Sequence, residues 1–135
     1  MSKKFPHPKN KQEQFIFLDG KFQNIFNNVE SFKVLEYSDN LDGWTEEHTE
    51  MSEHEIGSKH PIDVSSRNLC KYLLNKYNKS EKNIVLEIGC SSGHMINEIS
   101  SSANNYYIGS DVLKKSISRI ANKYQNIPFV VFDIL

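Results

Sequence analysis

Three short apolar runs, separated by segments of helical length, constrain the fold of this chain more than any other feature of its sequence. The runs are NIVLEIG, YYIGSD and FVVFDIL, which begin at Asn83, Tyr106 and Phe129. Each has the length and the β-branched or aromatic content of a strand that is buried on both faces. Strands of this kind, joined by helices, predict a parallel α/β sheet with right-handed crossovers.

The segments before and between these runs have the periodicity of amphipathic helices. In DVSSRNLCKYLLNKYNK, Leu69, Leu73 and Tyr77 recur on one helical face, and Asp63 or Ser65 is the expected N-cap. HMINEISS and VLKKSISRIANKY are predicted as two further helices. The predicted order is therefore a helix followed by β-α-β-α-β.

The first 60 residues differ in texture from the rest, because they are polar, rich in Asn, Lys and Glu, and only weakly periodic. We expect a mobile N-terminus to about Gln14 and short irregular elements after it, pinned by aromatic side chains. The expected anchors are Phe15, Phe17, Phe22, Phe26, Phe32, Tyr37 and Trp44. The chain thus divides into a leader or lid segment, residues 1–60, and a sheet-forming segment, residues 61–135.

Charge and composition exclude several classes of protein. The chain has 16 basic and 17 acidic residues, so no basic excess favours nucleic acid or an anionic membrane surface as a partner. The N-terminus has no signal-peptide core, and no apolar stretch approaches the roughly 18 residues of a membrane span. Two cysteines form no disulfide framework. We expect a cytoplasmic protein that binds neither nucleic acid nor membrane.

The turn after the first predicted strand, EIGCSSGHM from Glu87, is open to three interpretations. As G-x-S-x-G it fits the nucleophile elbow of a hydrolase, but that site needs a histidine after the serine, and the last histidine is His94. As a dinucleotide fingerprint it lacks the second and third glycines, where Ser91 and His94 stand. A loop that binds a ligand without phosphate requires fewer glycines. Gly89 and Gly93 are enough, because they allow positive φ and let the ligand approach the backbone closely.

Acidic residues follow each of the three predicted strands. Glu87, Asp111 and Asp133 lie at or near carboxyl ends, where parallel sheets bind ligands. A carboxylate at Asp111 is suited to two ribose hydroxyls, and Asp133 with the amide of Ile134 is placed to read an adenine edge. The structural alternatives are that Asp111 is a helix N-cap and that Glu87 caps its own turn.

VLEIGCSSGHM, YIGSD and FVVFDIL resemble motifs I, II and III of the class I S-adenosylmethionine-dependent methyltransferases. GWTEEHTEMSEHEIGSKHPIDVSSR resembles the leader and first helix of a bacterial group of these enzymes, so the resemblance covers roughly residues 43–135. It departs at Ser91, where glycine is commoner. The resemblance implies a Rossmann-like methyltransferase sheet with S-adenosyl-L-methionine as cofactor. The residues that it implicates in cofactor binding are Arg67, Glu87, Gly89, Cys90, Ser91, Gly93, Asp111, Val112, Asp133 and Ile134.

The resemblance also implies a role for each of these positions. Glu87 would face the methionine amino group, and Asp111 would take the ribose hydroxyls while Val112 packs on adenine. Arg67 is a candidate for the methionine carboxylate, with a surface ion pair as its structural alternative. Cys90 is expected to be a small packing residue, because no base follows it for a thiol nucleophile.

Histidines in the leader alternate with glutamates, but they predict no metal site. A spacing of six places His48 and His54 on different helical faces, unlike the histidine pair of a zincin. If the leader is a lid, one of His48, His54 and His60 is expected to reach the methyl acceptor.

The last predicted strand ends at Leu135, where a methyltransferase sheet would continue. We therefore expect the cofactor-binding half of a truncated enzyme, with an uncovered sheet edge at which a second polypeptide can pair. The expected function is methyl transfer to a small-molecule or glycan-type acceptor, with no catalytic residue identified. The alternative is a non-catalytic module that binds the nucleoside cofactor or a partner protein and is completed in trans.

Overall fold

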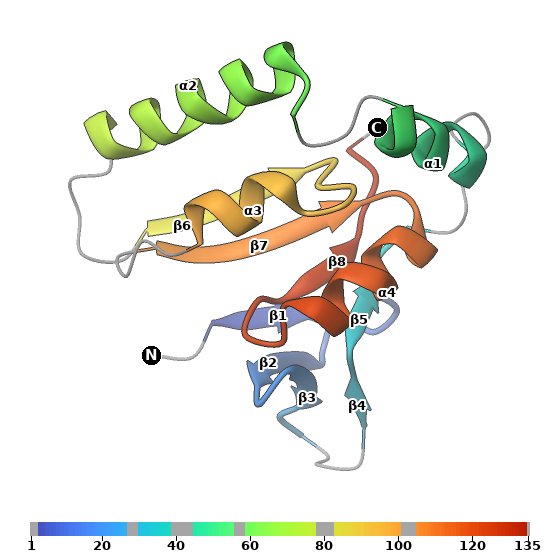
Figure 1. The fold of residues 1–135 in the computed structure, drawn as a ribbon. Helices are drawn as coiled ribbons and strands as arrows, with labels where there is room; N and C mark the ends of the chain where they lie inside the picture. The colour runs from blue at the N-terminus through green and yellow to red at the C-terminus, as the bar shows by residue number, and fades with distance from the viewer. Residues whose placement is uncertain are drawn as a thin grey trace.

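The structure, a computed structural model, describes residues 3–26, 30–38, 45–55, 59–77, 83–100 and 105–134. The strands are β1 (Lys4–Pro6), β2 (Gln14–Leu18), β3 (Lys21–Asn24), β4 (Ser31–Phe32), β5 (Val34–Glu36), β6 (Asn83–Ile88), β7 (Asn105–Asp111) and β8 (Phe129–Val131). The helices are α1 (Glu46–Glu55), α2 (Pro61–Tyr77), α3 (His94–Ile99) and α4 (Lys114–Lys123). They form a mixed α/β fold with one antiparallel sheet, ordered β1-β2-β3-β4, and one parallel sheet, ordered β5-β8-β7-β6 (Figure 1).

The predicted β-α-β-α-β order is confirmed by β6, α3, β7, α4 and β8, whose strands pair in parallel. Two boundaries differ from the prediction. The third strand ends at Val131, and the residues after it have no regular structure. Helix α2 begins at Pro61, before Asp63 and Ser65. Proline is suited to the first turn of a helix, because the N–H that it lacks would have no partner there.

The leader is more regular than its sequence predicts. Residues expected to be mobile or irregular form β1 to β5, and the first four of these strands build the antiparallel sheet. Phe5, Phe15 and Phe22 are buried from this sheet and pack with Leu35 and Val130 of the parallel sheet. These strands are only two to five residues long, which is too short for a clear alternation of apolar and polar residues in the sequence.

The expected aromatic anchors therefore have different outcomes. Phe15 and Phe22 are completely buried, which confirms them, and Phe17 and Tyr37 pack against the same core. Phe26 is 66% exposed and is no anchor. Phe32 is also exposed, although its ring contacts that of Phe15. Trp44 lies outside the described residues.

The leader also supplies a strand to the parallel sheet, which the sequence did not predict. β5 pairs in parallel with β8, so that Val34 lies opposite Phe129, and Tyr37 N donates to Val131 O at 2.8 Å. The side chain of Leu35 is buried on the face toward the antiparallel sheet. Within the described residues, the parallel sheet thus contains one strand from the leader and three from the later segment.

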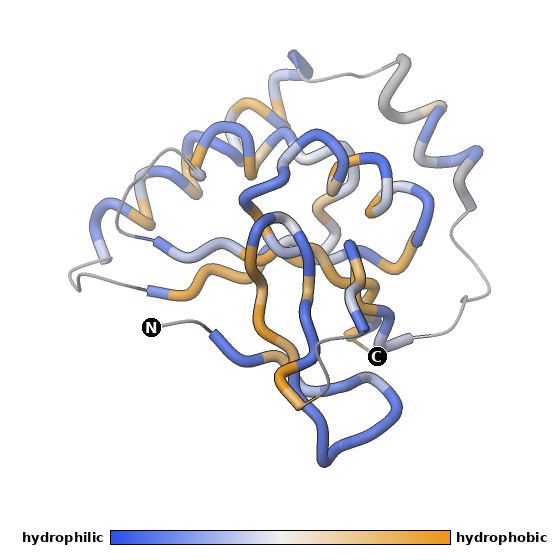
Figure 2. Tube along the Cα trace, turned by 90° about the horizontal axis from the view of Figure 1, so that it is seen from below, coloured by the Kyte–Doolittle hydropathy of each residue, from blue (hydrophilic) through white to orange (hydrophobic). Residues whose placement is uncertain are grey.

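The two faces of the parallel sheet have different covers. Helices α3 and α4 cover one face, where the core consists of Cys90, Ile96, Ile117, Ile120, Ala121, Phe129 and Val131. The antiparallel sheet covers the other face near β5 and β8. Figure 2 shows that β6, at the far edge, is hydrophobic along most of its length. Within the described residues, no helix is both long and apolar enough to cross a membrane.

Candidate functional site

The turn between β6 and α3 has an unusual backbone. Gly89, Ser91 and Gly93 have φ values of 74°, 42° and 76°, in the left-handed region that favours glycine. The N–H groups of Gly89 and Cys90 both donate to Ser110 O at 2.9 Å, which fastens the turn to β7. Gly93 N closes the turn by donating to Cys90 O at 2.7 Å. Ser91 therefore has a positive φ without being a glycine, held in a turn that Gly89 and Gly93 flank.

Asp111 connects this turn to the end of β7. Its Oδ2 accepts from Ser91 N at 3.0 Å, and its Oδ1 accepts from Leu113 N at 3.0 Å. The residue at the N-cap position of α4 is Leu113, so Asp111 forms a short turn before the helix and is not its N-cap. Each carboxylate oxygen has a further lone pair, so both can still accept from a ligand.

Glu87 lies on the same sheet face as Asp111. In the parallel register Glu87 is opposite Gly109, which is two residues before Asp111 and therefore on the same face of β7. Among the described residues, Glu87 Oε2 is buried without a hydrogen-bond partner. Burial, and then the negative charge of Asp111, raises the pKa of Glu87 to about 7. A half-buried carboxylate with one buried, unpartnered oxygen is an acceptor for a ligand that brings a proton donor or a positive charge.

The turn is open to a ligand at one of its glycines. Apart from its two chain neighbours, no described residue has an atom within 4 Å of the position that a Cβ of Gly89 would occupy. At Gly93 a Cβ would lie 3.2 Å from the ring of Tyr124, so this glycine is needed for packing against α4. The approach to the backbone is therefore free at the Gly89 end of the turn.

Two residues near the turn have structural roles. Cys90 is only 3% exposed, and its side chain belongs to the core, as predicted for a packing residue. Burial raises the pKa of its thiol well above the usual range. Only the backbone of Cys90 belongs to the site. Ser110 is fully buried and donates from Oγ to Glu87 O at 2.9 Å, a positioning contact that the sequence did not reveal.

Arg67 is occupied by an ion pair. It is 8% exposed, and its Nε lies 2.6 Å from Glu98 Oε1 on α3. Lys71 Nζ lies 3.2 Å from the other oxygen of Glu98. Hydrogen bonds from both cations lower the pKa of Glu98. Arg67 therefore connects α2 to α3 through a largely buried ion pair, and its contact with a methionine carboxylate stays a prediction.

The residues after β8 lie beside Asp111 at the end of β7. Asp111 is opposite Val131 in the register, and Phe132 N donates to Asp111 O at 3.1 Å. The N–H of Asp133 donates to Ser38 Oγ at 2.8 Å, so the leader holds this segment. Ile134 is 64% exposed. Val112, which follows Asp111, is half-buried.

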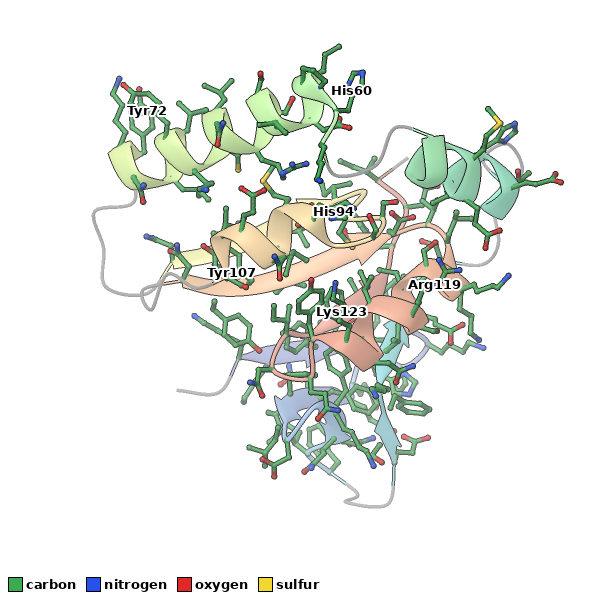
Figure 3. The ribbon with its side chains drawn as sticks, viewed as in Figure 1. His60, Tyr72, His94, Tyr107, Arg119 and Lys123 are labelled. Carbon is green, nitrogen blue, oxygen red and sulfur yellow. The ribbon has the colours of Figure 1, made fainter. Side chains whose placement is uncertain are left out.

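The histidines lie on separate elements. Figure 3 shows His60 where α2 begins and His94 at the start of α3. At the start of α1, Thr45 Oγ1 accepts from the backbone N–H of His48 at 3.3 Å, which is an N-cap hydrogen bond, and it also lies 3.0 Å from His48 Nδ1. The side chain of His54 lies outside the description. Contact of a histidine with the acceptor stays a prediction.

A further group of side chains lies in the antiparallel sheet. His7, Glu13 and Glu30 each have a potential ligand atom within 4.8 Å of the others. However, His7 Nδ1 accepts from Lys9 N at 3.0 Å and from Asn10 N at 2.8 Å. A neutral imidazole has one acceptor nitrogen, so this one already serves to shape the loop between β1 and β2.

Comparison with known proteins gives no match among protein-family models and none among curated proteins. Function is therefore inferred from the turn and the strand ends themselves.

Proposed function

We propose that the chain binds S-adenosylmethionine at the turn of residues 89–93, as the cofactor-binding part of a Rossmann-like class I methyltransferase domain. The observation that carries the proposal is the pair of carboxylates at the ends of neighbouring parallel strands. Glu87 and Asp111 flank a turn with three left-handed residues, and Asp111 is bonded to the backbone of that turn.

The charge of the site favours this cofactor over a dinucleotide. The diphosphate of a dinucleotide would approach two carboxylates, Glu87 and Asp111, and like charges repel. S-adenosylmethionine instead has an ammonium group and a sulfonium. The unpartnered Oε2 of Glu87 is suited to the ammonium, and the remaining lone pairs of Asp111 are suited to the ribose hydroxyls.

The described residues also indicate how the ligand would be held. The open space at Gly89 allows the backbone to approach the ligand without a clashing Cβ. Ser91 N is held by Asp111, so the ribose contact and the shape of the turn depend on one side chain. Asp133 and the amide of Ile134 lie beyond the neighbouring strand end, and we place the adenine edge there.

When bound, S-adenosylmethionine supplies an electrophilic methyl group on sulfur. The chain contributes binding and orientation, which are the main protein contributions to a displacement of this kind. We place the methyl acceptor among small molecules or glycan precursors, and no general base is assigned to the described residues.

The proposal is tested by calorimetric titration of the chain with S-adenosylmethionine, with NAD as the competing ligand class. We expect binding of the first and none of the second. Asp111→Asn should weaken binding by at least about tenfold, because an amide offers one acceptor oxygen in place of two. Asp63→Asn is the matched control, since Asp63 is exposed in the first turn of α2. A folded chain that binds NAD as tightly, or binds neither ligand, contradicts the proposal.

A second candidate is a module that binds the cofactor without transferring its methyl group. It is favoured by the outer face of β6, which no described residue covers. The two are separated by incubation with methyl-labelled S-adenosylmethionine and a panel of small metabolites and glycan precursors. Transfer of label supports the enzyme, whereas binding with no transfer supports the module.

A further inference from the structure

The outer face of β6 is an apolar surface with no cover among the described residues. β6 lies at the edge of the parallel sheet, where β7 is its one neighbouring strand in the described chain. Ile84, Leu86 and Ile88 alternate onto the face opposite α3, and each is about half exposed. Edge strands are usually protected by charge, proline or a bulge. On this face β6 has none of these.

Helix α2 adds a second apolar row to the same surface. Leu69, Leu73 and Tyr77 lie on one helical face and are 40 to 67% exposed. With Ile84 and Val85 they line a groove of about 570 Å³ between α2 and the edge of β6. Ile84 belongs both to this groove and to the outer row of β6, so the two apolar rows meet at the edge of the sheet.

The two rows match each other in spacing. Residues four apart on a helix are separated by about 6 Å along its axis. Residues two apart on a strand are separated by about 6.6 Å. Three side chains of α2 and three of β6 therefore have similar repeats over similar lengths, and Figure 1 shows α2 running roughly along β6. Because the repeats are similar, the side chains of such a helix can pack against those of such a strand.

We propose that this surface binds a second copy of the chain, with α2 of each copy packed on the outer face of β6 of the other. A two-fold axis in the plane of the sheet, beside β6 and along the strands, produces this reciprocal contact. The same axis keeps α2 of one copy away from α3 of the other, because α3 lies on the opposite face of the sheet from the β6 row.

The area of the surface agrees with a dimer. The six side chains of the two rows expose on the order of 600 Å² per copy, close to the roughly 800 Å² that each partner contributes to a standard interface. Charge does not oppose association, since the net charge of the chain is −1. The proposal does not depend on the ligand of the turn.

Sedimentation equilibrium of the full chain between 1 and 200 µM tests the dimer. We expect twice the chain mass for the wild type. Leu86→Lys on β6 and Leu73→Lys on α2 should each weaken association by at least about tenfold, because a lysine ammonium would be buried without a partner. Leu18→Lys is the matched control, since Leu18 is 48% exposed on the antiparallel sheet, away from this surface. Circular dichroism confirms that each variant is folded.

Mixing the two variants tests the reciprocal geometry. In a mixed dimer of Leu73→Lys and Leu86→Lys, one helix–strand contact has both lysines and the other has neither, so association should partly recover. If α2 instead packed on α2 and β6 on β6, mixing would restore nothing. A monomeric wild type at 200 µM, open-ended association without a dimer, or a Leu86→Lys dimer of wild-type affinity overturns the proposal, as does a mixture without recovery.

Discussion

At the scale of single residues, Glu87 is the side chain of the proposed site whose protonation and stability can be tested most directly. Its Oε2 is buried and has no hydrogen-bond partner among the described residues, and its pKa is raised to about 7 by burial and by Asp111. A buried carboxylate of this kind costs stability in the ligand-free protein. That cost is expected at a binding site, where an unsatisfied group is available for the ligand.

The cost of Glu87 should be visible in the pH dependence of stability. The folded pKa of about 7 lies above the ordinary value of 4.5, so the folded state binds more protons between these values. The free energy of unfolding therefore falls as the pH rises through this window. Glu87→Gln should raise the free energy of unfolding by about 1 to 3 kcal/mol at pH 8, with little effect near pH 4.5.

Urea unfolding of the wild type and of Glu87→Gln at the two pH values measures this difference. Glu47→Gln is the matched control, because Glu47 is exposed in α1. An equal effect of Glu87→Gln at both pH values, or a loss of stability at pH 8, would show that the Glu87 carboxylate has a compensating partner in the folded protein.

The two outer glycines of the turn allow a paired prediction. Gly89 and Gly93 have nearly the same positive φ, so alanine should cost about 1 kcal/mol or more of backbone strain at each. Gly93→Ala should destabilise the protein further, because its Cβ would lie 3.2 Å from the ring of Tyr124. Thermal unfolding measures the difference. Equal losses would contradict the packing role of Gly93.

At the scale of elements, β7 depends on a glycine within the strand. A Cβ at Gly109 would lie 2.5 Å from two ring atoms of Phe129 and 2.8 Å from Ile96 Cδ1. Gly109→Ala should therefore cost roughly 1 to 3 kcal/mol in stability from overpacking. In the double variant with Phe129→Leu, the two losses should add to less than their sum. Strict additivity in urea unfolding would rule out the steric explanation.

The elements that the sequence predicted correctly are those with strong local patterns. NIVLEIG and the helix of Ile117 and Ile120 show their periodicity within a few residues, so β6 and α4 could be predicted. β5 could not be predicted, because three residues carry little pattern and its partner β8 lies far along the chain. The antiparallel strands were missed for the same reason of length.

The site was predictable to a similar extent. Asp111 and the glycines of the turn follow from their position after predicted strands. Ser110 and Ser38 were missed, because their roles depend on which strands and loops become neighbours. The ion pair of Arg67 could not be predicted, since its partner Glu98 lies on another helix.

At the scale of the whole molecule, we propose different binding roles for two surfaces of the parallel sheet. The carboxyl ends of β6 and β7 present carboxylates around an open turn, which we propose for S-adenosylmethionine. The outer face of β6 presents an apolar row, which we propose for a second copy. The surfaces are separate, so a variant that breaks the dimer should leave ligand binding unchanged.

The most direct measurement of the central claim is a two-dimensional amide NMR titration with S-adenosylhomocysteine, which is the demethylated product of the proposed cofactor. We predict that amide signals of Gly89, Ser91, Gly93 and Asp111 shift with saturation, while those of Phe15 in the antiparallel sheet do not. Saturating ligand that leaves the turn signals unmoved, or that shifts only the antiparallel sheet, would contradict the account.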